Sequence, residues 1–207
     1  FFERANNDFK LSGNEWYYAH SLLDVSEYNL YLHYFSRADS ILKLAETYTT
    51  DDMYLARFYE TKGLYFYELQ QYDSALVYFK KGLPLWQHEE YRLYSYMKIM
   101  QVYLDMDSLA QALPYAQSII HNTQNPTFLV NAYYCMMQDA NAKNDTKRLS
   151  EYSHARADAE KSLRDYVSIS AETVPKFSEY LSNPHPLRWV WILISCIIGI
   201  CLLLVLG

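Results

Sequence analysis

Apolar side chains in this sequence recur at the three- and four-residue spacing of amphipathic helices, and that pattern repeats along the chain. The clearest copy, residues 59–82, aligns with its neighbours at a constant step of 37 residues. The step is marked by Ala38, Ala75, Ala112 and Leu149. A small residue early in a helix lets it approach its neighbour closely, and residues four and seven further on face the same way. The pattern therefore predicts stacked helical hairpins.

Each hairpin consists of a first and a second helix, which gives a coarse map of the chain. The first helices are expected near residues 14–33, 52–69, 89–105 and 127–143, and the second helices near residues 36–49, 72–86, 107–121 and 146–169. Asp107 and Asp145 stand where N-caps are expected, and Asp51 with its neighbours offers another. Pro126 suits the first turn of its helix.

One copy of the repeat matches a known family position by position. Its marker residues are Tyr59, Gly63, Phe66, Tyr72, Ala75, Phe79 and Gly82. They resemble the tetratricopeptide repeat (TPR), although the closing proline is missing. The first and third copies keep part of the pattern, and the fourth is degenerate. The resemblance implies an all-α, TPR-like solenoid of about four helix pairs, and a step of 37 against the family's usual value of about 34 implies slightly longer helices or loops.

The last part of the chain has a different character. Residues 189–207 form a run of roughly 19 residues without a charge, long enough as a helix to span about 28 Å of hydrocarbon. We therefore expect one C-terminal transmembrane helix, anchored in the lipid bilayer beside Trp189 and Trp191. Ser195 and Gly199 form a small-xxx-small pair that would allow two such helices to associate as a homodimer.

These patterns divide the chain into four regions. Residues 1–13 form an N-terminal segment, 14–169 the solenoid with a long capping helix at its end, 170–188 a connector, and 189–207 the transmembrane helix. The sequence does not begin with Met and stops where the apolar run stops, so we expect it to be part of a longer protein.

Composition and charge exclude several functions. The net charge is -6, and no acidic or basic residue follows Arg188, so the solenoid lacks the basic stripe that nucleic acid requires. The chain before the uncharged run has the glycines Gly13, Gly63 and Gly82, which are too few for a phosphate-binding loop. We expect no nucleic-acid partner, no metal and no cofactor.

No arrangement of residues in the sequence favours catalysis. His88 lacks the second histidine of a zinc-protease helix, and Asp105 with Asp107 lacks the glycine and distant glutamate of a calcium loop. Cys135 has no histidine partner in the pattern and is expected to be a buried thiol. We therefore expect a protein that is not an enzyme.

A binding surface is the better prediction, because the chain contains 22 tyrosines and tyrosine is favoured at recognition surfaces. In the resembled family the first helices line a groove that binds a protein or peptide. Mapped onto this chain, that face carries Arg57, Glu60, Tyr67, Tyr94, Met97, Asn131, Tyr134 and Gln138. The family's clamp for a C-terminal carboxylate is missing, since Leu23, Glu60, Met97 and Tyr134 stand at its positions.

Two functions remain open. The first is the extracytoplasmic, periplasmic sensing region of a single-pass membrane protein, which resembles bacterial regulators that place such repeats before a membrane helix and a signalling or transcription-regulating effector. The second is a tail-anchored scaffold that recruits cytosolic partners to a membrane. The residues that follow Gly207 would distinguish them.

Overall fold

The computed structural model describes the backbone of residues 2–48 and 51–182, and the side chains of residues 7–48 and 51–165. Within these residues the regular structure is α-helix with one 3-10 turn, and no strand occurs. No helix among them is long and apolar enough to cross a membrane. The transmembrane helix expected at residues 189–207, including Ser195 and Gly199, lies outside the described residues.

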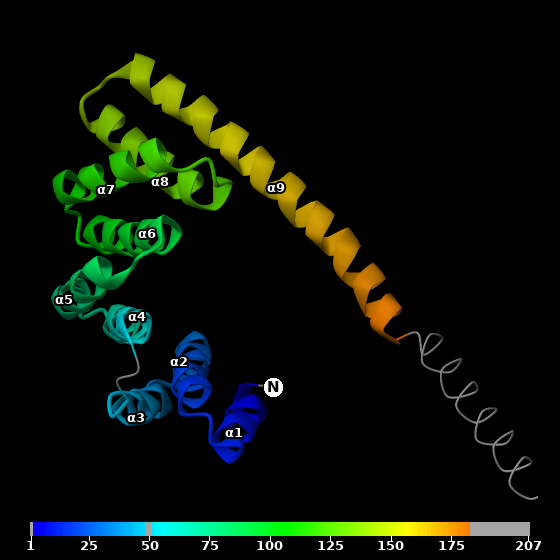
Figure 1. Ribbon diagram of the computed structural model, residues 1–207. Helices are drawn as coiled ribbons and strands as arrows, with labels where there is room; N and C mark the ends of the chain where they lie inside the picture. The colour runs from blue at the N-terminus through cyan, green and yellow to red at the C-terminus, as the bar shows by residue number, and fades with distance from the viewer. Residues whose placement is uncertain (1, 49–50, 183–207) are drawn as a thin grey trace, which may run out of the picture. The chain divides into compact units, whose positions relative to one another are not determined.

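The 37-residue step of the sequence is reproduced in the structure (Figure 1). The four first helices have 17 residues each: α2 (Glu15–Tyr31), α4 (Asp52–Glu68), α6 (Glu89–Asp105) and α8 (Pro126–Ala142). The second helices are α3 (Phe35–Ala45), α5 (Tyr72–Gly82), α7 (Leu109–Asn122) and α9 (Thr146–Ser182). The predicted helix pairs are thus confirmed, including the fourth, whose sequence is degenerate.

The turn between the two helices of each pair has the same geometry in every repeat. His33, Gln70, Asp107 and Asn144 have positive φ values between 53° and 58°. The amide of the next residue reaches back to a carbonyl five residues earlier, as in Tyr34 N to Asn29 O at 2.8 Å and Asp145 N to Ala140 O at 2.8 Å. This is the Schellman arrangement, which satisfies the last carbonyls of the first helix and reverses the chain.

Side-chain caps hold the starts of several helices. Asp51 accepts a hydrogen bond from Tyr54 N at 2.7 Å, and Asp145 accepts one from Arg148 N at 3.0 Å, as predicted. Pro126 is the first residue of α8, also as predicted. Asp107 is not an N-cap: it occupies the left-handed turn position, and Ser108 precedes α7 without a side-chain cap bond.

The apolar interior is divided among successive helix pairs. Ala38, Ala75 and Ala112, which mark the sequence repeat, are fully buried. One cluster joins α2, α3 and α4 around Leu23, Leu42, Tyr54 and Phe58; the next joins α5 and α6 around Phe79 and Ile99; the third joins α6, α7 and α8 around Met100, Ile119 and Cys135. Neighbour-to-neighbour burial of this kind is the property of a helical solenoid.

Two elements extend the repeats. Helix α1 (Phe2–Ser12) precedes the first pair within the predicted N-terminal segment and packs against α2. Helix α9 continues beyond residue 169 to Ser182, and the chain divides into compact units at Glu160 and Lys161. In the first unit, the beginning of α9 contacts α8 through Tyr152, whose ring lies 6.4 Å from that of Tyr133.

Candidate functional site

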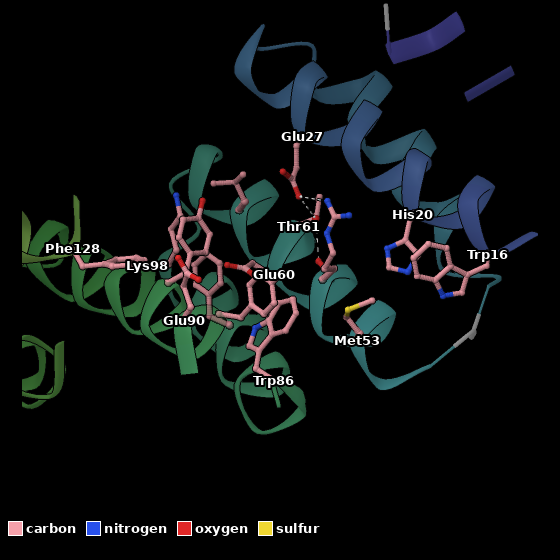
Figure 2. A pocket seen from close by; sticks show the side chains of 15 residues that line it. Trp16, His20, Glu27, Met53, Glu60, Thr61, Trp86, Glu90, Lys98 and Phe128 are labelled. Carbon is pink, nitrogen blue, oxygen red and sulfur yellow. Dashed lines mark hydrogen bonds and ion pairs between the residues drawn. The ribbon is translucent and has the colours of Figure 1, made fainter. Parts of the chain in front are cut away.

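A cavity of about 570 Å³ opens on the face formed by the first helices. Helices α2 and α4 pack together, as do α6 and α8, whereas α4 and α6 do not approach as closely, and the cavity lies between them. The short turn η1 (Leu83–Leu85) packs against α4 and α5, and the residue after it, Trp86, lines the cavity. The lining residues, which define the main cavity, are Trp16, His20, Glu27, Met53, Arg57, Glu60, Thr61, Leu64, Phe79, Trp86, Glu90, Tyr91, Tyr94, Lys98 and Phe128 (Figure 2).

Aromatic rings form the wall at the α2 end of the main cavity. The Trp16 ring lies 4.0 Å from the His20 ring, and His20 meets Tyr54 edge-on at 5.3 Å. The Trp16 indole N–H donates to Asp51 Oδ2 at 2.8 Å, so the cap of α4 also holds the tryptophan in place. These contacts fix α2 against the start of α4.

Trp86 forms the wall beside α6. It is 4% exposed, and its ring lies 4.8 Å from that of Tyr91. Its indole N–H donates to the buried Ser95 hydroxyl at 3.0 Å. Because a buried indole N–H requires an acceptor, this bond fixes the orientation of the ring.

A charged network joins α2 to α4 at the upper edge of the cavity in Figure 2. Arg57 Nη2 lies 2.7 Å from Asp24 Oδ1 and 3.8 Å from Glu27 Oε1. The Thr61 hydroxyl donates to Glu27 Oε1 at 2.8 Å. The guanidinium is thus neutralised by carboxylates of the neighbouring repeat.

Glu60 is the unusual member of the site. Its Oε1 atom is buried and has no hydrogen-bond partner. Burial, and secondarily the charge of Glu27, raise the pKa of the Glu60 carboxyl to about 8, although Lys98 and Arg57 act in the opposite direction. The site therefore contains an acid that is mostly protonated at neutral pH.

His20 is the second polar group left without a partner in the main cavity. Its side chain is 7% exposed, and Nε2 has no hydrogen-bond partner. Burial, followed by the positive charge of Arg57, lowers the pKa of the His20 imidazole below its ordinary value. The ring is accordingly neutral at pH 7. Buried polar atoms without partners are rare in folded proteins, and two of them line this one cavity.

A second cavity of about 170 Å³ continues along the same face toward α8. It is lined by Tyr67, Met97, Lys98, Gln101 and Asn131, together with Phe79. The Tyr67 hydroxyl donates to Asp105 Oδ2 at 2.7 Å, and Asn131 Nδ2 lies 3.7 Å from Met97 Sδ. Lys98 and Phe79 border both cavities.

The structure brings together six of the eight residues predicted to face a ligand. Arg57, Glu60 and Tyr94 line the main cavity, and Tyr67, Met97 and Asn131 line the second. Tyr134 and Gln138 line neither of these two cavities. The Tyr134 side chain is 45% exposed, and the Arg156 guanidinium lies 5.1 Å from its ring centre. Contact of any of the eight with a partner stays a prediction.

Several lining residues were not predicted, although the 37-residue repeat locates them in the sequence. His20 precedes Arg57 by one 37-residue step, and Trp16, Met53 and Glu90 follow one another at the same step. Extending the mapped face to the first repeat would have found His20, and extending it four residues toward the start of each first helix would have found Trp16, Met53 and Glu90. Trp86 could not be found in this way, because it belongs to a connector that the repeat pattern does not describe.

Many of the tyrosines serve packing between helices. Tyr54 is fully buried, and its hydroxyl donates to Ala45 O at 2.6 Å. The Tyr115 ring lies 5.6 Å from that of Tyr96 and 6.1 Å from that of Tyr103, and the Phe66 and Tyr78 rings stack at 5.2 Å. The abundance of tyrosine is therefore not by itself a measure of binding surface.

Within the side chains that the structure describes, no three His, Cys, Asp or Glu residues gather to hold a metal ion. Cys135 is fully buried, and burial raises the pKa of its thiol to about 11. A thiol in that state is a poor nucleophile.

Comparison with solved structures supports the repeat fold. The crystal structure of MamA matches this chain with a TM-score of 0.59, covering 80% of this chain and 90% of that chain, at 16% sequence identity. At this level of identity the likeness shows the fold alone, a TPR-like helical repeat. No protein-family model and no curated protein matches the sequence at a significant level.

Proposed function

We propose that this chain is a non-catalytic region that binds a protein or peptide segment on its first-helix face, and that it belongs to a single-pass membrane protein. The observation that carries the binding proposal is the main cavity with its two buried polar atoms, Glu60 Oε1 and His20 Nε2. A cavity of this volume accommodates side chains of a partner, whose polar groups would supply the missing hydrogen bonds.

The exposed side chains at the edge of the main cavity are also suited to binding a partner. Trp16, Tyr91 and Tyr94 are each between 37% and 47% exposed at the edge of the main cavity. Large aromatic side chains with one exposed edge are typical of recognition surfaces, because they bury much area with few rotatable bonds. The polar groups between them provide specificity.

Crosslinking tests this proposal directly. A photoreactive benzoylphenylalanine at Tyr94 is expected to form a discrete covalent adduct in native cells, whereas the same residue at Val77 is not. Val77 is a matched control because it is 52% exposed and lies on the second helix α5. Equal adducts at both positions, or none at Tyr94, would contradict binding on the first-helix face.

The membrane part of the proposal rests on the sequence. The uncharged run at residues 189–207 has the length and aromatic flank of a spanning helix. We propose that the solenoid lies outside the cytoplasm, in the periplasm, and that it senses a ligand for an effector on the other side. Rearrangement or dimerisation on binding would pass through α9 to the membrane helix.

Sidedness separates this function from the tail-anchored scaffold. The complete gene product would be expressed in its native cells and treated with a protease outside the anchoring membrane. Removal of residues 1–180 while the anchoring membrane is still intact is the expected result for a sensor. Protection until the cells are lysed would place the repeats in the cytosol and favour recruitment of soluble partners.

A further inference from the structure

The main cavity is lined by more carboxyl groups than cations. Three carboxyl groups line it, on Glu27, Glu60 and Glu90, against the two cations Arg57 and Lys98. The Glu60 carboxyl, with its pKa of about 8, is mostly protonated at neutral pH while no cationic ligand lies beside it. Arg57 is already paired with Asp24 at 2.7 Å and with Glu27 at 3.8 Å. Its charge is therefore largely neutralised within the fold, which leaves Lys98 as the other cation among the lining residues.

The walls of the cavity favour positive charge for an independent reason. The faces of Trp and Tyr rings carry negative potential and attract ammonium and guanidinium groups. The chain uses this contact repeatedly: Lys62 Nζ lies 5.2 Å from the Tyr78 ring centre, and Lys98 Nζ lies 5.0 Å from that of Tyr94. Trp86 and Tyr91, like Glu60, are among the residues that line the main cavity, and their rings offer further faces.

The Glu60 oxygen without a hydrogen-bond partner also favours a cationic ligand. Glu60 Oε1 accepts from no group in the fold although it is buried. A cationic side chain supplies several N–H donors at once, three on lysine and five on arginine. An approaching cation would also favour the ionised form of Glu60, because opposite charges at short range stabilise one another.

We infer that the main cavity binds a positively charged side chain, lysine or arginine, of the partner segment, with Glu60 as its carboxylate and the Trp86 and Tyr91 rings as its walls. The inference rests on the proposed function, because it names the chemistry of the segment that would bind on this face. An acidic side chain is disfavoured, since it would meet the carboxylates of Glu27 and Glu90 while Arg57 is already paired within the fold.

The test uses hexapeptide pools in which one position is fixed as Lys, Arg, norleucine, Gln or Glu and the others are varied. Binding of each labelled pool to the full chain is measured by fluorescence anisotropy. The Lys or Arg pool is expected to bind at least about tenfold more tightly than the norleucine pool, which has a similar length but no charge. Comparison of Lys with Arg shows which of the two cations is preferred.

Two variants make the test specific to this site. Glu60→Gln keeps the shape of the side chain but cannot ionise when a cation approaches, so the preference for cations is expected to disappear. Glu68→Gln is the matched control, because Glu68 lies on the same helix and outside both cavities. It is expected to keep the preference.

The outcomes separate this inference from the proposed function. If the pools bind without a cation preference and the crosslinker at position 94 still forms an adduct, the cation site is contradicted. Binding on the first-helix face would then still be supported. A preference for Glu, or one unchanged in Glu60→Gln, would also overturn it. Failure of every pool to bind, together with no adduct at position 94, would overturn both.

Discussion

The ring of Phe79 on α5 lies directly over Gly63 on α4, so that a Cβ atom at residue 63 would stand 2.7 Å from two of its ring carbons. Phe79 is 1% exposed and belongs to the core cluster between α5 and α6. The close approach of the two helices in this pair therefore depends on the absence of a side chain at residue 63. This contact explains why the tetratricopeptide-like pattern of this repeat contains both a glycine at residue 63 and a phenylalanine at residue 79.

We expect Gly63→Ala to destabilise the fold by about 1–2 kcal/mol, since overpacking outweighs the better helix propensity of alanine. Urea denaturation followed by circular dichroism measures the change. In the double variant Gly63→Ala with Phe79→Leu, the smaller side chain leaves room for the methyl group, and the alanine should cost less than it does alone. If the free-energy changes of the two single variants simply add in the double variant, the contact between residues 63 and 79 is contradicted.

Substitution at the left-handed turn should have the opposite effect. Gln70→Gly is expected to stabilise the fold by about 1 kcal/mol, because glycine adopts a positive φ without the steric cost that a side chain incurs. Thermal unfolding would show a higher midpoint. Gln70→Ala serves as the control and should give no gain, because alanine retains the Cβ atom. A rise with both variants would point to a cause other than backbone conformation.

Stability should depend on pH through Glu60. Its carboxyl pKa is about 8 in the folded chain against 4.5 in its ordinary state, so the folded chain binds the proton more tightly. Stability from this group is therefore present at low pH and is lost as pH rises from about 4.5 to about 8. Relative to Glu60→Gln, the wild-type chain should lose on the order of 4 kcal/mol over this range, since one pKa unit corresponds to about 1.4 kcal/mol, as measured by urea denaturation at several pH values. Parallel pH profiles would contradict the buried state of Glu60.

The indole bond that orients Trp86 can be tested by removing its acceptor. Ser95→Ala leaves the buried N–H without a partner and is expected to cost about 1–3 kcal/mol in the free energy of unfolding. Ser40→Ala, at an exposed serine on α3, is the control and should change little. In a Trp86→Phe background Ser95→Ala should cost less, because no indole N–H remains to be satisfied. An equal cost there would show that the bond does not matter.

Most of the fold could be predicted from the sequence because the determinants of each hairpin are local. The spacing of apolar residues located the helix pairs, and the step of 37 residues located the first helices to within about two residues. The misassigned cap at Asp107 shows the limit of that reasoning. An aspartate between two helices suits both an N-cap and a left-handed turn, and the Schellman bond from Ser108 N to Tyr103 O selects the turn.

The candidate site was predictable in part. The first-helix face contains Arg57, Glu60 and Tyr94 because the repeat period also sets which residues face the same way. Trp86 was not predicted, since it lies in a connector outside the period. Tyr134 lies on the predicted face but lines neither of these two cavities. The Arg156 guanidinium lies 5.1 Å from its ring, and contact between side chains from different helices is not encoded in the period of either.

The sequence alone determined that this protein is a stack of helical hairpins with a mildly acidic, tyrosine-rich character, because helix formation and pairing depend on residues a few positions apart. Only the tertiary structure decided that α4 and α6 stand apart around Trp86, and that Glu60 and His20 have buried atoms without partners. Burial and the shift in pKa that follows from it arise from residues of several repeats acting together. No single repeat contains that information.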